Sequence, residues 1–308
     1  MATCMATLAL ALGYPKNAPA PHGWGASLAG PFAVDARAAR RPPNPRPRLP
    51  SVAALRKAWG YARERGGDVS VAVVDTRGRL RGRRADTGYV SASVVKAMLL
   101  AAELRRLERD GLALDPATQG LLRAMITESD NDAADSIYLR VGDAGLSDVA
   151  RSARLRRFTV AGYWANAQIT AADMARYFSR LPQLLAGPHG KWGLALFGAI
   201  TKEQRWGVPR AAGRPWSVLF KGGWRATGQG ELVHQVALLR DGNRNLAIAV
   251  LTDAQPSQLY AIHTVRGIAD RLLDRRSLVT VRRRSGTTER DRGPESETAT
   301  APVHAGFR

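Results

Sequence analysis

The spacing of apolar and polar residues changes along the chain and predicts its first elements. Between residues 51 and 67 the apolar positions recur at helical spacing, so a helix is expected there with Ser51 as its N-cap. Residues 69–84 instead alternate with a period of two around a turn at 75–78. This second pattern predicts a β-hairpin directly after the helix.

The rest of the pattern predicts a helical block followed by more strands. From residue 93 to about residue 200 the apolar positions are mostly helical in spacing. Strands are expected at 216–220, 231–239 and 246–251, and a last helix over 256–274. The predicted fold is therefore α/β (α+β): a five-stranded antiparallel sheet flanked by terminal helices, with an inserted all-helical lobe and an active site in the cleft between the lobes.

Composition separates the two ends of the chain from its centre. Residues 1–50 are rich in proline and arginine towards their end and are predicted to be a disordered or leader and linker segment. Residues 275–308 are predicted to be a disordered tail. The folded domain is expected over 51–274, with a sheet lobe at 51–92 and 206–274 and a helical lobe at 93–205.

The charge of the chain is strongly positive, +20 at pH 7, and comes from arginine far more than from lysine. The basic residues do not gather on one helix face or alternate with aromatic residues, so we expect no specific nucleic-acid partner. Contact of the basic ends with anionic envelope polymers stays open. The expected partner of the folded domain is a small-molecule or peptide-like substrate.

Other classes of site are disfavoured by residue counts. The one cysteine, Cys4, excludes an internal disulfide, and the five scattered histidines lack metal-ligand spacing, so we expect no metal and no cofactor. No apolar run has the roughly 18 to 20 residues of a membrane span, and no integral membrane segment is expected. The opening MATCMATLALALG lacks the basic start of a clear secretory signal.

The stretch Ser93-Val94-Val95-Lys96 places a serine and a lysine on one helix face, because residues i and i+3 are neighbours there. A serine hydroxyl becomes nucleophilic when a base removes its proton, and a desolvated lysine serves as that base. Arginine is never neutral in proteins. Only six lysines stand against forty arginines, so a lysine at 96 indicates chemistry that arginine cannot perform.

Two further stretches carry similar side chains. Ser129-Asp130-Asn131 precedes a helical pattern, and by itself it indicates a helix cap. Lys221-Gly222-Gly223 follows the apolar run SVLF, and by itself it indicates a strand that ends in a glycine turn. Bare glycines also let a substrate backbone approach, with the amide of Trp224 pointing into the site.

Together these stretches match the S-x-x-K, S-D-N and K-T-G order of class A β-lactamases and penicillin-binding proteins. The chain resembles that superfamily over roughly residues 51–274, and more specifically its β-lactamase-related serine hydrolases. The resemblance implies a Ser93 nucleophile, Lys96 as its base and Ser129 as the proton relay. It also implies that Lys221 makes the cleft positive, and that Asn131, Gly222, Gly223 and Trp224 contact the substrate. The oxyanion hole would be the amides of Ser93 and Trp224.

Two departures from the family pattern bear on the reaction. No glutamate occurs between Asp130 and Lys202, where class A enzymes carry the base for deacylation. Trp164, Asn166 and Gln168 occupy that region, and an amide is not a general base at neutral pH. In addition, Gly222 replaces the threonine that helps to bind a β-lactam carboxylate in the family.

The sequence leads to a serine hydrolase that acts through an acyl-enzyme on an amide or ester and lacks the class A glutamate. A penicillin-binding peptidase or weak β-lactamase is one alternative. A noncatalytic binding module with the same fold is the other. The resemblance also implies a secreted or envelope location.

Overall fold

The computed structural model describes residues 50–185 and 187–274. All of them belong to the second of the two units into which the chain divides, Pro45–Arg308. The predicted tail at 275–308, and the predicted leader and linker segment at 1–50 except for Pro50, lie outside the described residues.

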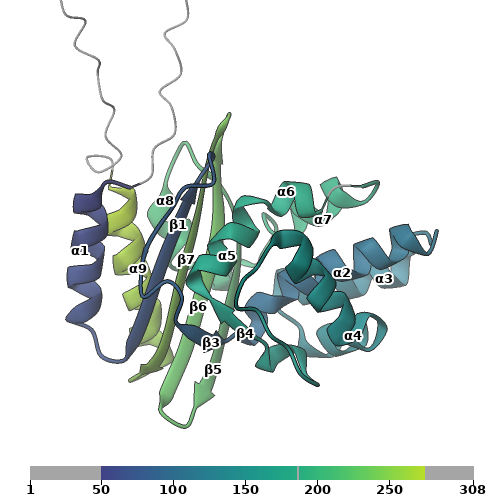
Figure 1. The fold of residues 1–308 in the computed structure, drawn as a ribbon, viewed down its shortest axis with the longest axis horizontal. Helices are drawn as coiled ribbons and strands as arrows, with labels where there is room; N and C mark the ends of the chain where they lie inside the picture. Colours follow the sequence, from purple (N-terminus) through teal and green to yellow (C-terminus); the bar gives the residue numbers. More distant parts are fainter. Residues whose placement is uncertain (1–49, 186, 275–308) are drawn as a thin grey trace, which may run out of the picture. The chain divides into compact units, whose positions relative to one another are not determined.

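The core of the described part is a five-stranded antiparallel sheet with strand order β2-β1-β7-β6-β5 (Figure 1). Its strands are β1 (Asp68–Asp75), β2 (Leu80–Arg83), β5 (Ser217–Thr227), β6 (Gly230–Asp241) and β7 (Arg244–Gln255). The two central strands, β7 and β6, are almost fully buried and rich in Val, Ile, Leu and Ala, as expected for strands covered on both faces. The sheet predicted from the alternating pattern is confirmed.

Two helices from the ends of the described part cover one face of this sheet. These are α1 (Val52–Arg63) and α9 (Gln258–Leu273), which lie side by side in Figure 1. Ser51 is the N-cap of α1, as predicted, and its Oγ accepts a hydrogen bond from the amide of Ala54 at 3.0 Å. Ser257 caps α9 in the same way, so that helix begins two residues after the predicted Pro256.

Most of the chain between β2 and β5 forms the second lobe, on the side of the sheet opposite α1 and α9 (Figure 1). Its α-helices are α2 (Lys96–Arg109), α3 (Pro116–Arg123), α4 (Asn131–Ala153), α5 (Ala171–Ser179), α6 (Leu181–Leu184) and α7 (Gly190–Leu196). The short helix α8 (Val208–Ala212) instead packs against α9, on the other side of the sheet (Figure 1). Single turns of other helix types are η1 (Ala92–Val95), η2 (Ala124–Glu128), η3 (Trp164–Asn166) and η4 (Lys202–Gln204).

The inserted lobe is not purely helical. The short strands β3 (Gly88–Val90) and β4 (Gln168–Thr170) form a separate two-stranded antiparallel sheet that was not predicted. The helix expected from Ser93 onward also differs, because residues 92–95 form the 3₁₀ turn η1 and the α-helix begins at Lys96. This small sheet ties the chain before η1 to the chain after η3, so it holds two sides of the candidate site together.

His234 belongs to the core of the sheet and not to the chemistry of the cleft. Its ring is fully buried on β6, with Nε2 2.9 Å from the carbonyl oxygen of Val90. Its Nδ1 accepts a hydrogen bond from the amide of Thr252 at 3.1 Å. Burial lowers the pKa of His234 to about 4, so the ring is neutral near pH 7.

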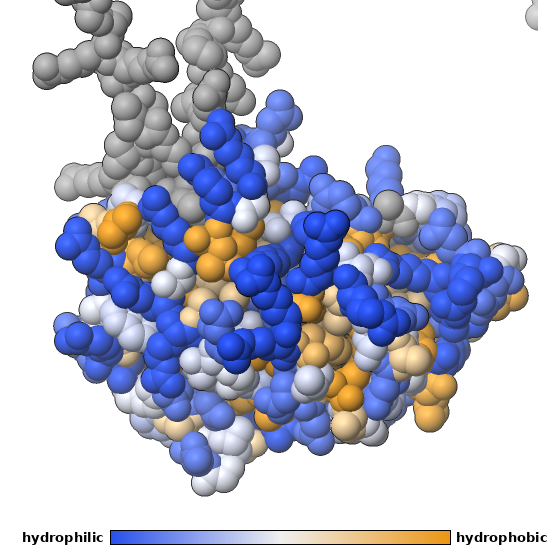
Figure 2. Space-filling view, viewed as in Figure 1, coloured by the Kyte–Doolittle hydropathy of each residue, from blue (hydrophilic) through white to orange (hydrophobic). Residues whose placement is uncertain are grey.

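Polar residues dominate the visible surface in Figure 2, and the apolar areas are smaller and lie among them. The helices of the described residues include none that is both long and apolar enough to cross a lipid bilayer. Within the same residues, no group of three or more His, Cys, Asp and Glu side chains is placed to hold a metal ion.

Candidate active site

Ser93 lies in the 3₁₀ turn η1, between β3 and α2. Its neighbours Val94 and Val95 are fully buried and anchor the turn, whereas Ser93 is partly exposed and faces a cavity. The turn begins at Ala92, whose φ of 43° is unusual for a residue with a side chain. Such strain persists where packing imposes it and is frequent at functional sites.

Lys96 follows Ser93 by three residues and is the first residue of α2. Its side chain has no exposed surface. Its Nζ donates hydrogen bonds to the carbonyl oxygens of Ser129 at 2.6 Å and Asp130 at 3.0 Å, and to Oδ1 of Asn131 at 2.8 Å. These three bonds use every N–H of the ammonium form.

Burial of Lys96 lowers the pKa of its amine to about 8, because the charged form loses its hydration. The charges of Asp130 and Asp135 oppose this shift. A fraction of Lys96 is therefore neutral at ordinary pH. The neutral amine keeps two N–H donors and has a lone pair available for a proton.

Ser129 sits at a break between two helices. The π-helical turn η2 ends at Glu128, and the next residue, Ser129, adopts the left-handed conformation with φ 66° and ψ 31°. Asp130, and not Ser129, is the N-cap of α4, since its Oδ1 accepts a hydrogen bond from the amide of Ala133 at 2.7 Å. The capping role expected for this motif thus falls on Asp130, and the Ser129 hydroxyl is left for the cavity.

Lys221, Gly222, Gly223 and Trp224 lie inside β5, which extends to Thr227. A strand end at Phe220 was therefore a wrong prediction. The register with β6 continues without interruption, with Lys221 opposite Val236 and Gly223 opposite His234. Because β5 is the edge strand, its outer side is available to the cleft.

Lys221 is also completely buried, and its Nζ donates hydrogen bonds to Oγ of Ser129 at 2.9 Å and to the carbonyl oxygen of Gly222 at 3.1 Å. Burial, and then the charge of Lys96, hold the pKa of Lys221 well below its ordinary value. The other lysines of the described residues, Lys57, Lys191 and Lys202, are exposed. The buried lysines are thus the two that the sequence motifs singled out.

Gly223 brings β5 against the turn that carries Ser93. A Cβ at this position would lie 2.9 Å from the amide nitrogens of Ser93 and Val94, closer than real Cβ atoms approach. Glycine is therefore required by the contact between the edge strand and η1.

Gly222 faces a different neighbourhood. Its missing side chain leaves room for Trp206 and Trp224, whose rings pack edge to face with centroids 6.3 Å apart. Two indoles thus occupy the side of β5 where the family threonine would stand. Trp206 packs against the core, and Trp224 reaches the cavity.

The cavity beside Ser93 has a volume of about 280 Å³. Four of the predicted site residues line it: Ser93, Ser129, Asn131 and Trp224. Lys96 and Lys221 lie behind this surface and contact it through Ser129 and Asn131. Gly222 and Gly223 shape β5 next to it and are not among the lining residues.

Several lining residues were not recognised as site residues in the sequence. Ala92, Tyr163, Ala165 and Arg225 line the cavity together with Trp164. Nη1 of Arg225 donates a hydrogen bond to Oδ1 of Asn166 at 3.0 Å, which holds an arginine at the rim. Its position directly after Trp224 on the edge strand was the only sequence signal for it.

Trp164 occupies the region where a deacylating glutamate was sought. Its indole is nearly fully buried, with the Lys96 Nζ 4.8 Å from the ring centre. Its Nε1 donates a hydrogen bond to Oδ1 of Asp135 at 2.6 Å. Asp135, on α4, is thus a carboxylate close to the site that the sequence motifs did not indicate.

The sequence model of the beta-lactamase enzyme family matches residues 116–275, more than half of the chain. The chain belongs to the beta-lactamase enzyme family. Membership and fold together support serine hydrolase activity in general. A search of curated proteins finds no match to this chain.

Solved structures of the family share the fold. A beta-lactamase from Burkholderia vietnamiensis matches with a TM-score of 0.64 and 21% identity, covering 72% of this chain and 95% of that one. A class A beta-lactamase from Mycobacterium abscessus matches with a TM-score of 0.61 and 20% identity, covering 71% and 98%. A beta-lactamase from Xanthomonas campestris pv. campestris matches with a TM-score of 0.62 and 19% identity, covering 71% of this chain and 96% of that one. At these identities the likeness shows the fold alone.

Proposed function

We propose that this beta-lactamase family protein is a serine hydrolase that acylates Ser93 with an amide or ester substrate and releases the acyl group slowly. The observation that carries the proposal is the attachment of Ser129 to two buried lysines. Lys96 bonds to its carbonyl oxygen at 2.6 Å and Lys221 to its hydroxyl at 2.9 Å, directly behind the cavity that Ser93 faces.

In the acylation step, neutral Lys96 takes the proton from Oγ of Ser93 as that oxygen bonds to the substrate carbonyl carbon. The electron pair of the carbonyl moves to its oxygen, which the amides of Ser93 and Trp224 stabilise. When the carbonyl re-forms, the bond to the leaving nitrogen or oxygen breaks. Ser129 gives its proton to that atom, and Lys221, which already donates to Ser129, replaces it.

The cavity favours a substrate with an apolar part and an anionic group. Trp224 and Tyr163 supply apolar walls, and the Arg225 guanidinium supplies a positive charge at the rim. The side of β5 next to Gly222 is filled by Trp206 and Trp224, in place of a threonine hydroxyl. This supports a substrate other than a β-lactam.

Slow release follows from the residues near Lys96. Deacylation needs a base that activates water, and the buried indole of Trp164 lies where the family base is sought. The Asp135 carboxylate is engaged by the indole Nε1. We therefore infer a covalent intermediate that accumulates.

The test is to treat the folded protein separately with a fluorophosphonate and a fluorescent penicillin and to locate adducts by mass spectrometry. An adduct on Ser93 with the fluorophosphonate, lost in Ser93→Ala and retained in Ser152→Ala, is the expected result. Ser152 is an exposed serine on α4 and serves as the matched control. Absence of any Ser93 adduct with both reagents contradicts the proposal and favours a noncatalytic module.

The penicillin arm separates the proposal from the other alternative. Rapid formation of a penicilloyl adduct, or its turnover, would indicate a penicillin-binding peptidase or weak β-lactamase. A fluorophosphonate adduct with little or no penicilloyl adduct supports the amide or ester hydrolase.

A further inference from the structure

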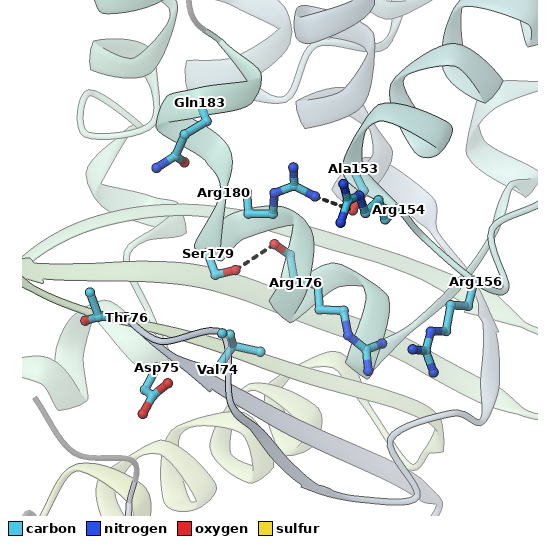
Figure 3. Close-up of a pocket in the computed structure, with 11 residues that line it drawn as sticks. Val74, Asp75, Thr76, Ala153, Arg154, Arg156, Arg176, Ser179, Arg180 and Gln183 are labelled. Atoms are coloured by element: carbon cyan, nitrogen blue, oxygen red, sulfur yellow. Dashed lines mark hydrogen bonds between the residues drawn. The ribbon is translucent and has the colours of Figure 1, made fainter.

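A second and larger cavity, of about 410 Å³, lies between the end of β1 and the segments that end α4 and form α5 and α6 (Figure 3). It shares no lining residue with the cavity around Ser93. Its volume falls within the range of small-molecule sites. Nothing in the proposed hydrolase reaction uses it.

Four arginines line this cavity: Arg154, Arg156, Arg176 and Arg180. Figure 3 shows the side chains of Arg156 and Arg176 pointing toward one another, and the Arg180 guanidinium pointing toward Arg154. Like charges repel, by about 1 kcal/mol for a pair 4 Å apart in water and by more where water is partly excluded. Such convergence is favourable when an anion lies between the guanidinium groups.

The two carboxylates near the cavity, those of Asp75 and Asp173, already accept hydrogen bonds from other groups. Asp75 accepts four hydrogen bonds, from the amides of Arg77 and Arg79 and from the guanidinium of Arg79. Asp173 accepts hydrogen bonds from the amides of Arg156 and Arg157, and contacts Arg176 only at 3.4 Å.

Of the four guanidinium groups, that of Arg176 forms an ion pair with Asp173 at 3.4 Å, and the other three form none in the described part of the chain. Arg180 donates to the neutral carbonyl oxygen of Ala153 at 3.2 Å. Within residues 50–185 and 187–274, the guanidinium groups of Arg154 and Arg156 form no ion pair. The cavity therefore holds a net positive charge that the described part of the chain does not neutralise.

Specific backbone features fix the positions of two of these arginines, Arg154 and Arg156. Arg154 ends α4 in the left-handed conformation, with φ 55° and ψ 43°, where glycine or asparagine is the usual residue. Asp173 is buried at the start of α5 and fixes the turn that carries Arg156. Arg154 is thus held in a strained backbone conformation, and the backbone at Arg156 is held by a buried carboxylate; backbone strain of this kind is frequent at functional sites.

We propose that this arginine cavity binds an anion that carries two neighbouring phosphate groups. Guanidinium groups match the oxygen geometry of phosphate with paired N–H donors, and each phosphate accepts from more than one arginine. Four arginines suit two such groups better than a single carboxylate. The source is either a small diphosphate compound or two adjacent phosphates of a polymer.

The experiment measures binding of inorganic pyrophosphate to the full chain by isothermal titration calorimetry at fixed ionic strength. Monophosphate, citrate and long-chain polyphosphate are the comparison probes. The test variant is Arg154→Gln/Arg156→Gln, since both side chains are exposed and carry no ion pair. The matched control is Arg56→Gln/Arg63→Gln on α1, which removes the same charge from the opposite face of the sheet.

The expected result is pyrophosphate binding that weakens about tenfold or more in the test variant and changes about twofold or less in the control. Monophosphate and citrate should bind more weakly than pyrophosphate. Ser93→Ala should bind pyrophosphate like the parent. Binding of polyphosphate alone, with the same dependence on Arg154 and Arg156, identifies the polymer as the source.

Three results overturn the proposal: no binding of pyrophosphate or polyphosphate, equal losses in the test and control variants, or citrate binding as tightly as pyrophosphate. Thermal unfolding gives an independent check that the test variant folds. Without any anion it should be at least as stable as the parent, because repulsion is removed. Pyrophosphate should then raise the melting temperature of the parent and of the control variant, and raise that of the test variant much less.

Discussion

Lys221 donates a hydrogen bond from its Nζ to Oγ of Ser129 over 2.9 Å, although 92 positions separate the two residues in the chain. Because Oγ of Ser129 accepts this bond, its own proton is free to point into the cavity that it lines. The edge strand thus sets the direction in which the Ser129 hydroxyl donates. Both residues have roles in the proposed reaction that depend on this one contact.

Replacing Lys221 with methionine should separate stability from activity. The change removes a buried amine, so we expect the free energy of unfolding at pH 7 to stay unchanged or to increase by about 1 kcal/mol. Labelling of Ser93 should slow by roughly a hundredfold, because proton transfer through Ser129 is lost. Urea unfolding measures the stability, and labelling reactions quenched at timed intervals measure the rate of Ser93 labelling. Lys202→Met, at an exposed lysine, is the control, and a large loss of stability in Lys221→Met would refute this account.

Lys96→Arg tests whether residue 96 acts as a base. Arginine keeps the positive charge but is not deprotonated, so we expect labelling of Ser93 to fall by roughly a hundredfold or more. The measurement is the rate of fluorophosphonate labelling of folded protein. Lys57→Arg, at an exposed residue of α1, should label at the parental rate. If Lys96→Arg labels at the parental rate, only the positive charge of residue 96 matters and residue 96 is not the base.

The labelling rate should depend on pH through Lys96. Burial lowers the pKa of Lys96 to about 8, and only the neutral amine accepts a proton. Below that pKa the neutral fraction grows about tenfold per pH unit, and above it the fraction levels off. The rate should therefore rise from pH 6 to about 8 and reach a plateau. A profile that is flat or falls over this range excludes Lys96 as the base.

Gly223→Ala should disrupt the contact between β5 and η1. The added Cβ meets two backbone nitrogens at 2.9 Å and the carbonyl oxygen of Ser91 at 3.1 Å, which backbone atoms relieve only by moving. We expect a loss of about 1 to 3 kcal/mol in stability and a roughly hundredfold slower labelling, since the oxyanion amides are displaced. Gly222→Ala meets only tryptophan ring atoms at 3.4 to 3.5 Å and should be nearly neutral in both assays.

The fold was predictable where the apolar pattern was long enough to show a period. The strands β1, β6 and β7 and the helices α1 and α9 each bury one face or both over eight residues or more. β3 and β4 have three residues each, too few to show alternation, so their pairing was missed. β5 was cut short because two glycines resemble a turn, and only the pairing with β6 shows that the strand continues.

The candidate site was predictable only as far as its motifs reach. The three-residue spacing of Ser93 and Lys96 and the rarity of lysine both point to chemistry. Asp135 was missed because no sequence motif includes it, and Arg225 because its position after Trp224 was the only signal for it; the proximity of both residues to the site depends on how α4 and β5 pack. The arginine cavity was missed for the same reason, since its residues come from separate segments between Val74 and Gln183.

Trp164→Phe should speed release of the acyl group. The indole of Trp164 lies 4.8 Å from the Lys96 Nζ, and its Nε1 donates to Asp135 at 2.6 Å. Phenylalanine lacks that donor and is smaller. The Asp135 carboxylate therefore loses its hydrogen bond from the indole and becomes available as a base, and the space beside Lys96 admits water. We expect the half-life of a Ser93 acyl adduct formed by an activated ester to shorten by roughly tenfold, as followed by intact-protein mass spectrometry.

Two further variants decide whether Asp135 is responsible. Trp164→Phe/Asp135→Asn should return the adduct to the parental half-life, because the amide accepts no proton at neutral pH. Tyr163→Phe, at a residue that lines the same cavity, should leave the half-life unchanged. If the double variant releases its adduct as fast as Trp164→Phe, the added space and not the carboxylate controls the reaction. If Trp164→Phe folds and keeps the parental half-life, the indole is not what retains the acyl group.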